Sequence, residues 1–407
     1  MSQTAKRLIK TSLSALHYSG VARLLAQSAR GLGAVLMLHH VRPASDRGFQ
    51  PNGILEITPD FLETVILEIR RAGFDIVSLD EAHARMTGVA EATRPFVAFT
   101  FDDGYRDNRD FAFPVMRRYD VPFTVYIASD FADRRGFLWW LVLERVIAAR
   151  HAVTVEFDGV KQTLACGNDR DKTAAFERIY WQLRNLPERD ARAIVAALAD
   201  ESGIDPLAPC RELAMTWSEI REFARNPLVT IGAHTVGHYA LAKLDADEAE
   251  AEIANSVARI ERELGRPCHH FCYPYGDEGS AGEREFEATA RIGIRTAVTT
   301  RKGFIYQDTA TRLTALPRVS LNGEYQRVSY LRALLSGVPF ALLRAVKRKR
   351  SGAPAQSPAV SSGFCIQRTS HAAGTTHANP PTTKNNSSPS LLPLTSSTTA
   401  TSIARNA

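Results

Sequence analysis

Acidic residues stop at Glu324, well before the end of this chain of 407 residues. The whole chain has 50 Lys and Arg against 44 Asp and Glu, and ten of the basic residues follow Glu324, so residues 1–324 carry a net charge of −4. A nucleic-acid surface would have to lie in the C-terminal segment alone, and we expect no nucleic-acid partner. The basic stretch 344–350 leaves peripheral contact with a membrane surface open.

Cysteine is scarce, and long hydrophobic runs are absent. The cysteines show neither CxxC nor zinc-ribbon spacing, and their number is odd, which is typical of free thiols in a reducing compartment. They are Cys166, Cys210, Cys268, Cys272 and Cys365. No window of about 18 apolar residues predicts a membrane-spanning helix, and polar residues interrupt the N-terminal stretch where a signal peptide needs an apolar core. We therefore predict a cytoplasmic protein.

Composition divides the chain into three parts. Residues 1–33 contain apolar residues at spacings that predict an amphipathic helical segment packed on the domain that follows. Residues 34–345 form the predicted folded domain. Residues 351–407 contain 20 Ser and Thr and 6 Pro, and such a segment cannot bury enough apolar surface to offset the entropy of ordering. We predict a disordered C-terminal tail.

Short apolar runs alternate with helical stretches between residues 34 and 325. One predicted helix begins at Thr58 and ends at Gly73, and another begins with a capping box formed by Asp245 and Glu248. Such alternation predicts a largely parallel sheet, open or closed as a barrel, with the active site at the carboxyl ends of its strands. The predicted strands are 35–38, 76–79, 96–99, 123–127, 228–231, 268–273, 297–299 and 319–321.

Residues 131–213 interrupt this alternation. They contain an aromatic helix start at 137–140, a hairpin pattern over Val153–Ala165 and two charged helices. We interpret the segment as an insertion. It could shape a binding cleft or be a purely structural excursion, and loop statistics favour neither.

The first motif with chemical potential is Thr100–Tyr105, TFDDGY, after the predicted strand 96–99. Adjacent side chains diverge at a strand end, so one of Asp102 and Asp103 can hold a metal while the other faces a substrate. The simpler interpretation of Asp-Gly at this place is a turn before a helix. This motif alone is only suggestive.

The second motif, GAHTVGH at 232–238, follows the predicted strand 228–231 and contains His234 and His238. A single histidine in such a place is more often a core residue than a ligand. Two imidazoles and one carboxylate, however, form a ligand set for a catalytic divalent metal with open positions for water and substrate. Together the two motifs predict a metal site.

The third motif is the loop Phe271–Asp277, in which Pro274 and Gly276 flank Tyr275. Such a loop can aim a backbone N–H into a site, where it stabilises a developing oxyanion. Taken alone, the pattern favours an ordinary aromatic turn.

In this order, TFDDGY, HTVGH and the YPYG loop resemble the motifs of the polysaccharide deacetylase (NodB-homology) family, carbohydrate esterase family 4. The resemblance covers about residues 34–325, with the insertion 131–213 outside the common core. It implies a distorted (β/α)7-type barrel and the metal-dependent removal of acetyl groups from N-acetylglucosamine-containing glycans or O-acetylated sugars.

The resemblance also implies roles for individual residues. Asp103, His234 and His238 would bind the metal, with Zn2+ as first choice and Co2+ or Ni2+ as alternatives, and Asp102 would be the general base. The metal would polarise the acetamide carbonyl and acidify a water whose proton Asp102 accepts. The backbone N–H of Tyr275 would hold the oxyanion, and the products would be acetate and an amine.

The sequence departs from the family pattern in two places. Cys272 stands where the family often has an arginine that pairs with the base; Arg318 could supply that charge, or it could be a surface arginine. The late Leu-x-His acid is absent, and His39 or His40 at the end of the first predicted strand is the candidate for a displaced general acid. These two histidines could also merely line the cleft.

These observations predict a hydrolase that removes N-acetyl groups from an N-acetylglucosamine-containing oligo- or polysaccharide and releases acetate. Two alternatives remain open. One is an esterase that acts on O-acetyl groups, because the metal–water step is shared. The other is a carbohydrate-binding relative that has lost turnover together with its acid and arginine. In each case the expected partner is an acetylated glycan.

Overall fold

A computed structural model of the protein describes residues 3–351, so the predicted disordered tail lies outside the described residues apart from Ser351. Seven parallel strands close into a barrel. The ring closes because the strand at residues 33–38 pairs with the strand at residues 96–101, from Gly33↔Phe96 to Leu38↔Phe101. Around the barrel the strands are β1 (Gly33–Leu38), β12 (Leu316–Ser320), β11 (Thr296–Lys302), β10 (His270–Cys272), β9 (Val229–Ala233), β6 (Phe123–Ile127) and β5 (Phe96–Phe101). The predicted (β/α)7-type barrel is confirmed.

The strands are apolar on both faces because both faces are buried. In β5, Val97 and Phe99 belong to the large cluster between barrel and helices, whereas Phe96 and Ala98 belong to a separate interior cluster. This alternation is that of a strand with core on either side. It also directs the next interior residue, Thr100, into the carboxyl end of the barrel.

The predicted strand at 76–79 is mostly wrong. The short strand β4 (Asp75–Ile76) pairs with the start of β5 and then ends. Ser78 instead caps α4 (Leu79–Met86), since its side chain accepts a hydrogen bond from the Glu81 N–H. Ser-x-x-Glu is a helix-start pattern, and here it overrides the apolar run.

Helices cover the outside of the barrel. α3 (Pro59–Arg71) begins as predicted, with the Thr58 side chain accepting from the Phe61 N–H. α12 (Ala246–Leu264) occupies its predicted range, but the predicted capping box is absent: Asp245 makes no side-chain cap, and Glu248 pairs with Arg189. The other helices between strands include α5 (Phe113–Arg118), α6 (Ser129–Ala132), α11 (Trp217–Phe223) and α13 (Glu283–Arg291).

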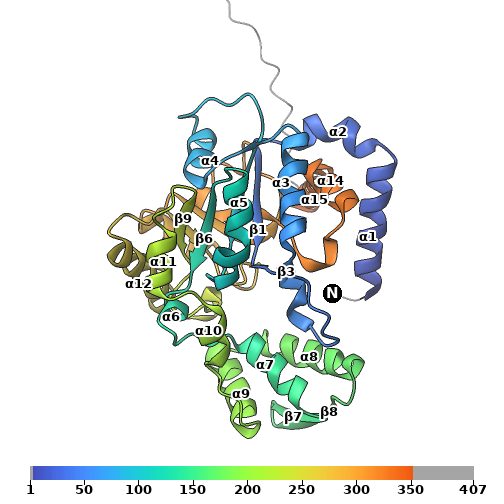
Figure 1. Cartoon of the computed structure of the whole chain (residues 1–407), viewed down its shortest axis with the longest axis vertical. Helices are drawn as coiled ribbons and strands as arrows, with labels where there is room; N and C mark the ends of the chain where they lie inside the picture. Colours follow the sequence, from blue (N-terminus) through green and yellow to red (C-terminus); the bar gives the residue numbers. More distant parts are fainter. Residues whose placement is uncertain (1–2, 352–407) are drawn as a thin grey trace, which may run out of the picture. The chain divides into compact units, whose positions relative to one another are not determined.

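The segment predicted as an insertion forms its own hydrophobic cluster at one end of the barrel (Figure 1). The predicted hairpin is present as an antiparallel pair. The elements of the segment are α7 (Trp139–Ala149), β7 (Ala152–Phe157), β8 (Val160–Ala165), α8 (Asp169–Leu183), α9 (Glu188–Glu201) and α10 (Ala208–Leu213).

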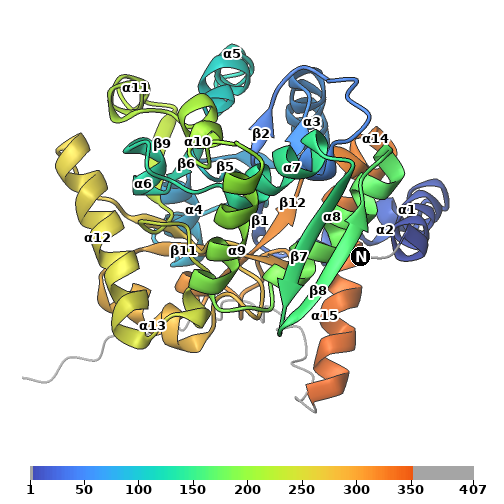
Figure 2. The ribbon, with the colours of Figure 1, turned by 90° about the horizontal axis from the view of Figure 1, so that it is seen from below.

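Two N-terminal helices, α1 (Gln3–Tyr18) and α2 (Val21–Ala29), lie beside α14 (Val328–Leu335) and α15 (Val338–Ser351) (Figure 2). Leu13 packs on Tyr330 and Ala333 of α14. Across residues 3–351 no single helix is long and apolar enough to span a membrane, although α14 and the 338–348 part of α15 pass that test together as a pair bent by 51°.

One carboxylate connects the helical segment that follows β5 to the start of α11. Glu219 accepts hydrogen bonds from Arg106 and from Arg109, which lies in the π-helix Asn108–Ala112, and it completes a capping box with Thr216. Partial burial acts to raise the pKa of Glu219, but the bonds from Arg106 and Thr216 outweigh it and lower the pKa to about 2.

We predict that Glu219→Gln destabilises the fold by about 2 kcal/mol at pH 7, because hydrogen bonds to a charged acceptor are lost. The folded-state pKa lies below the ordinary value of 4.5, so the contribution is present above pH 4.5 and disappears as the pH falls toward 2. Urea unfolding of the variant and the wild type at neutral and acid pH measures this contribution to the free energy of unfolding. Glu222→Gln, an exposed change in the same helix, should be silent; equal losses in the two variants would contradict the assignment.

Candidate active site

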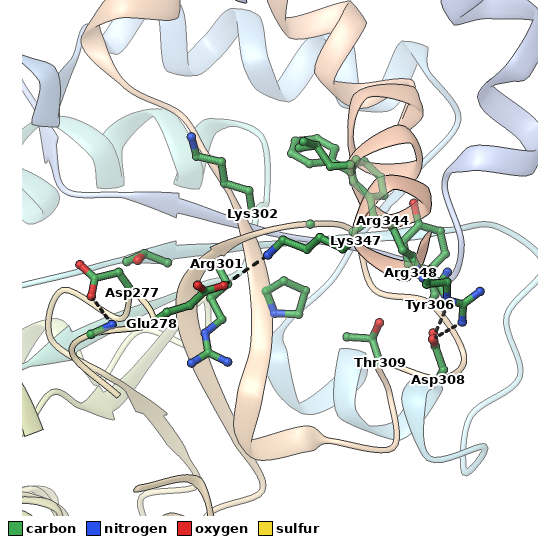
Figure 3. Close-up of a pocket in the computed structure, with 17 residues that line it drawn as sticks. Asp277, Glu278, Arg301, Lys302, Tyr306, Asp308, Thr309, Arg344, Lys347 and Arg348 are labelled. Atoms are coloured by element: carbon green, nitrogen blue, oxygen red, sulfur yellow. Dashed lines mark hydrogen bonds and ion pairs between the residues drawn. The ribbon is translucent and has the colours of Figure 1, made fainter. Parts of the chain in front are cut away.

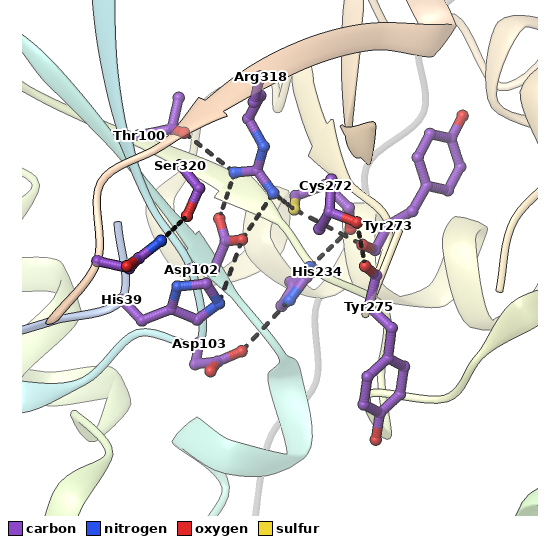
Figure 4. Close-up of polar contacts among 12 residues, drawn as sticks. His39, Thr100, Asp102, Asp103, His234, Cys272, Tyr273, Tyr275, Arg318 and Ser320 are labelled. Atoms are coloured by element: carbon purple, nitrogen blue, oxygen red, sulfur yellow. Dashed lines mark hydrogen bonds and ion pairs between the residues drawn. The ribbon is translucent and has the colours of Figure 1, made fainter. Parts of the chain in front are cut away.

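Three loops at the carboxyl ends of β5, β9 and β10 meet at one end of the barrel. Asp103, Thr235, His238 and Tyr275 on these loops all have positive φ, between 57° and 71°. Left-handed backbone at non-glycine residues is uncommon and collects at functional sites. The three motifs singled out in the sequence are therefore brought together (Figure 4).

Asp103, His234 and His238 converge on one point. The Asp103 Oδ1 atom lies 3.3 Å from Nε2 of His234 and 3.2 Å from Nε2 of His238. All three side chains are buried, and their ligand atoms lie within 4.8 Å of one another.

This donor set fits a divalent metal. Nδ1 of His234 lies 2.7 Å from the carbonyl oxygen of Cys272; a carbonyl can only accept, so in the neutral imidazole the proton sits on Nδ1 and the Nε2 lone pair faces Asp103. Asp103 Oδ1 is itself buried without a well-formed hydrogen bond. Lone pairs that face one another in a buried site require a cation between them, and two imidazoles with one carboxylate suit Zn2+.

Asp102, the neighbouring carboxylate, has a different partner. Both of its oxygens accept hydrogen bonds of 2.7 Å from Arg318. Burial acts to raise the pKa of Asp102, but the charge and hydrogen bonds of Arg318 outweigh it and the pKa is lowered. Asp102 is therefore ionised at neutral pH, and its orientation is fixed by a bidentate pair.

Arg318 is among the most buried side chains of the protein, so the alternative of a surface arginine does not hold. Its remaining donors reach the Thr299 carbonyl at 2.8 Å and the Thr100 hydroxyl at 3.0 Å, and its Nη2 lies 3.2 Å from the Cys272 sulfur. Asp102, His234 and Cys272 also lie close enough to hold an ion. Both oxygens of Asp102 already accept hydrogen bonds from Arg318. The group formed by Asp103, His234 and His238 is therefore the better candidate for a metal site.

The two histidines after β1, His39 and His40, have different partners. His39 Nε2 lies 3.8 Å from Asp102 Oδ2, and its side chain is 18% exposed, against 3% for Asp102. Burial lowers the pKa of His39 more than the Asp102 and Asp103 carboxylates raise it. Within residues 3–351 the side chain of His40 is hydrogen-bonded to neither Asp102 nor Asp103. Its Nδ1 lies 2.6 Å from Asp107, and its ring stacks on Tyr105 at 3.6 Å.

Tyr275 lies beside the metal ligands, with its ring centroid 4.9 Å from that of His238. The Thr300 hydroxyl donates to the Tyr275 carbonyl at 2.5 Å, which fixes the peptide. Within residues 3–351 the Tyr275 N–H has no hydrogen-bond partner. That donor is therefore not engaged by any of the described residues, and its contact with an oxyanion stays a prediction.

Side chains from the predicted insertion lie against the site, in line with the first of the two interpretations left open for this segment. The Trp139 indole donates to the Tyr275 hydroxyl at 2.8 Å, and the Trp140 ring lies 5.0 Å from that of His238. The Arg184 guanidinium stacks on the Tyr275 ring at 3.8 Å. The run of aromatics at 137–140 is the one signal in the sequence that pointed to these contacts.

A separate pocket of about 800 Å3 lies between β11, the 277–279 loop and α15 (Figure 3). It includes none of the predicted site residues. Its cations are Arg301, Lys302, Arg344, Lys347 and Arg348, and its carboxylates are Asp277, Glu278 and Asp308. Lys347 pairs with Glu278, and Arg344 and Arg348 pair with Asp308.

Comparison with known proteins gives a family match. Residues 90–158 and 173–297 match the family model of polysaccharide deacetylases. Of the predicted insertion, only residues 159–172 fall between the matched segments. The matched residues include both aspartates, both metal-site histidines and Tyr275, whereas His39, His40 and Arg318 lie outside them. No curated protein matches the chain.

Solved structures of similar proteins are remote in sequence. The deacetylase PplD of Streptococcus pyogenes, in complex with acetate, is 16% identical, with 72% of this chain and 93% of PplD covered and a TM-score of 0.48. IcaB of Ammonifex degensii is 19% identical, with 75% and 96% covered and a TM-score of 0.45. The deacetylase domain of BpsB from Bordetella bronchiseptica is 17% identical, with 71% and 95% covered and a TM-score of 0.44.

We predict that Asp103→Ala, His234→Ala and His238→Ala each lower zinc occupancy after dialysis by more than about tenfold, because each removes one of three ligands. Elemental analysis of the purified variants measures the occupancy. His151→Ala, an exposed change outside the site, is the matched control and should bind as the wild type. Unchanged occupancy in all three ligand variants would rule the site out.

Proposed function

The chain belongs to the polysaccharide deacetylase family, and from that premise we propose that it is a metal-dependent hydrolase that removes N-acetyl groups from an N-acetylglucosamine-containing oligo- or polysaccharide. The observation that carries the proposal is the pair of adjacent aspartates with different partners. Asp103 faces two imidazoles, and Asp102 is held by Arg318. One carboxylate is thereby arranged as a ligand and the other as a base.

Asp103, His234 and His238 would hold the metal, with Zn2+ preferred over Co2+ or Ni2+. When bound, such a cation supplies Lewis acidity at the acyl oxygen and lowers the pKa of water. Asp102 accepts the proton of the attacking water, since Arg318 keeps it ionised and fixed in direction.

The Tyr275 N–H donates to the oxygen of the acyl carbonyl as negative charge develops on it. His39 is the proposed general acid that protonates the leaving nitrogen. It lies beside Asp102, with its Nε2 3.8 Å from Asp102 Oδ2. The balanced reaction consumes one water and yields acetate and a free amine on the sugar.

The structure weakens the binding-only alternative. That alternative rested on a missing arginine and a missing acid, and Arg318 and His39 lie beside the base instead. An O-acetyl esterase remains the second candidate, because the same groups would serve an ester. A cytoplasmic location and membrane contact through 344–350 stay predictions.

We predict that the wild type releases acetate from N-acetylglucosamine oligomers faster than from O-acetylated xylan. Asp102→Asn should retain its metal and lose about 10²- to 10⁴-fold in kcat, because the amide cannot accept the proton. Enzymatic acetate determination measures the rates, and elemental analysis measures the metal.

Each outcome of that comparison decides a different point. Faster release from the xylan would replace the amidase by the esterase. Metal-bound protein that releases acetate from neither substrate would favour a binding-only relative. Substantial residual turnover in Asp102→Asn would remove this residue as the base.

The two candidate acids can be separated by substitution. We predict that His39→Gln lowers kcat by about 10²-fold or more with the metal retained, because the proton donor is lost. His40→Gln should change kcat by less than tenfold and mainly lower the melting temperature, since its contacts are structural. The reverse pattern would assign the acid to His40, and unchanged kcat in both would exclude both.

A further inference from the structure

The loop that carries the metal-site histidines has a conformation that must be held in place. Thr235 and His238 have φ values of 63° and 57°, a region that non-glycine residues occupy only where their surroundings enforce it. The polar backbone groups of this loop therefore need fixed partners.

On the barrel side the partners accept hydrogen bonds from the loop. Glu252 of α12 accepts from the N–H groups of Val236 and Gly237 at 2.9 and 2.8 Å. The Thr235 hydroxyl accepts from the His238 N–H at 2.9 Å. These contacts fix the N–H groups. The carbonyls of Thr235 and Val236 accept from the backbone N–H groups of Ser129 and Asp130 at 3.2 and 3.0 Å, which leaves the carbonyls of Gly237 and His238 to another partner.

That partner comes from the predicted insertion. Arg192 of α9 donates from one Nη atom to the carbonyls of Gly237 and His238 at 2.9 and 3.0 Å. Its guanidinium also lies 4.1 Å from the centre of the Tyr239 ring and 3.3 Å from Glu188. Since its side chain is only 13% exposed, the contact is protected from solvent.

The two histidines differ in how their rings are oriented. His234 is anchored through its Nδ1 to the Cys272 carbonyl, the usual arrangement for a metal-binding imidazole. Nδ1 of His238 is buried and has no partner within residues 3–351. The position of the His238 ring therefore depends on its backbone and on ring contacts with Phe131, Trp140 and Tyr275 at 5.5, 5.0 and 4.9 Å.

We propose that Arg192 is a positioning residue for the metal site: it holds the His238 backbone so that Nε2 faces Asp103. The proposal rests on the metal site of the proposed function. It assigns the insertion a direct part in metal affinity, because the side chain that fixes one ligand belongs to α9 rather than to the barrel.

The test compares three variants of the full chain. Arg192→Met keeps the length of the side chain and removes the donors, and Arg192→Lys keeps the charge with a single donor atom. Arg189→Met is the matched control, since Arg189 lies in the same helix and is mostly exposed. Zinc affinity is measured by competition with a chromophoric chelator below the melting temperature of each metal-free variant.

We expect Arg192→Met to weaken zinc binding by about 10- to 100-fold, as loss of an orienting contact does. Arg192→Lys should fall between this variant and the wild type, and Arg189→Met should bind within twofold of the wild type. At saturating zinc, kcat of the Arg192 variants should recover most of its loss. If Arg192→Met does not fold, Arg192→Lys carries the test.

Wild-type zinc affinity in both Arg192 variants, with only a lower melting temperature, would overturn the proposal and leave Arg192 a structural residue. A wild type that binds no zinc would contradict the metal site and this proposal together. A wild type that binds zinc but releases no acetate would contradict the proposed reaction alone, and the affinities of the variants would still decide the role of Arg192.

Discussion

A charged pair buried inside a closed barrel is the constraint on which the site depends. Arg318 on β12 reaches Asp102 after β5, Thr299 on β11 and Cys272 on β10, so one guanidinium connects four strands of the barrel. Removing one partner of such a pair leaves an uncompensated buried charge and costs about 3–5 kcal/mol. The pair also commits Asp102 to one orientation and leaves Asp103 to the histidines, so the two adjacent carboxylates have the different partners that the proposed function requires of a base and a ligand.

The loops around this pair are supported from two directions. The barrel fixes the strand ends, while the segment predicted as an insertion supplies Trp139 against Tyr275 and Arg192 against the histidine loop. The left-handed residues of these loops, such as His238, are retained because contacts on both sides hold them. Between the two alternatives left open by the sequence, this geometry favours a segment that takes part in the site over a structural excursion.

Much of the architecture follows from local patterns. Strands with both faces buried appear as continuous apolar runs, and polar motifs at their ends predicted which side chains meet. Local patterns conflict at 76–79, where the helix-start signal of Ser78 overrides an apolar run. They also cannot predict contacts between distant segments. Arg318 lies more than 200 residues from Asp102 in the sequence, and only the order of strands around the barrel shows that the two side chains meet.

The central claim is that hydrolysis depends on a cation between Asp103 and the two imidazoles, with Asp102 beside it as the base. The most direct measurement is acetate release from N-acetylglucosamine oligomers before and after treatment with a chelator, followed by addition of zinc. The account predicts that the chelator abolishes release and that zinc restores it. Release that continues unchanged in protein shown to be free of metal would contradict it.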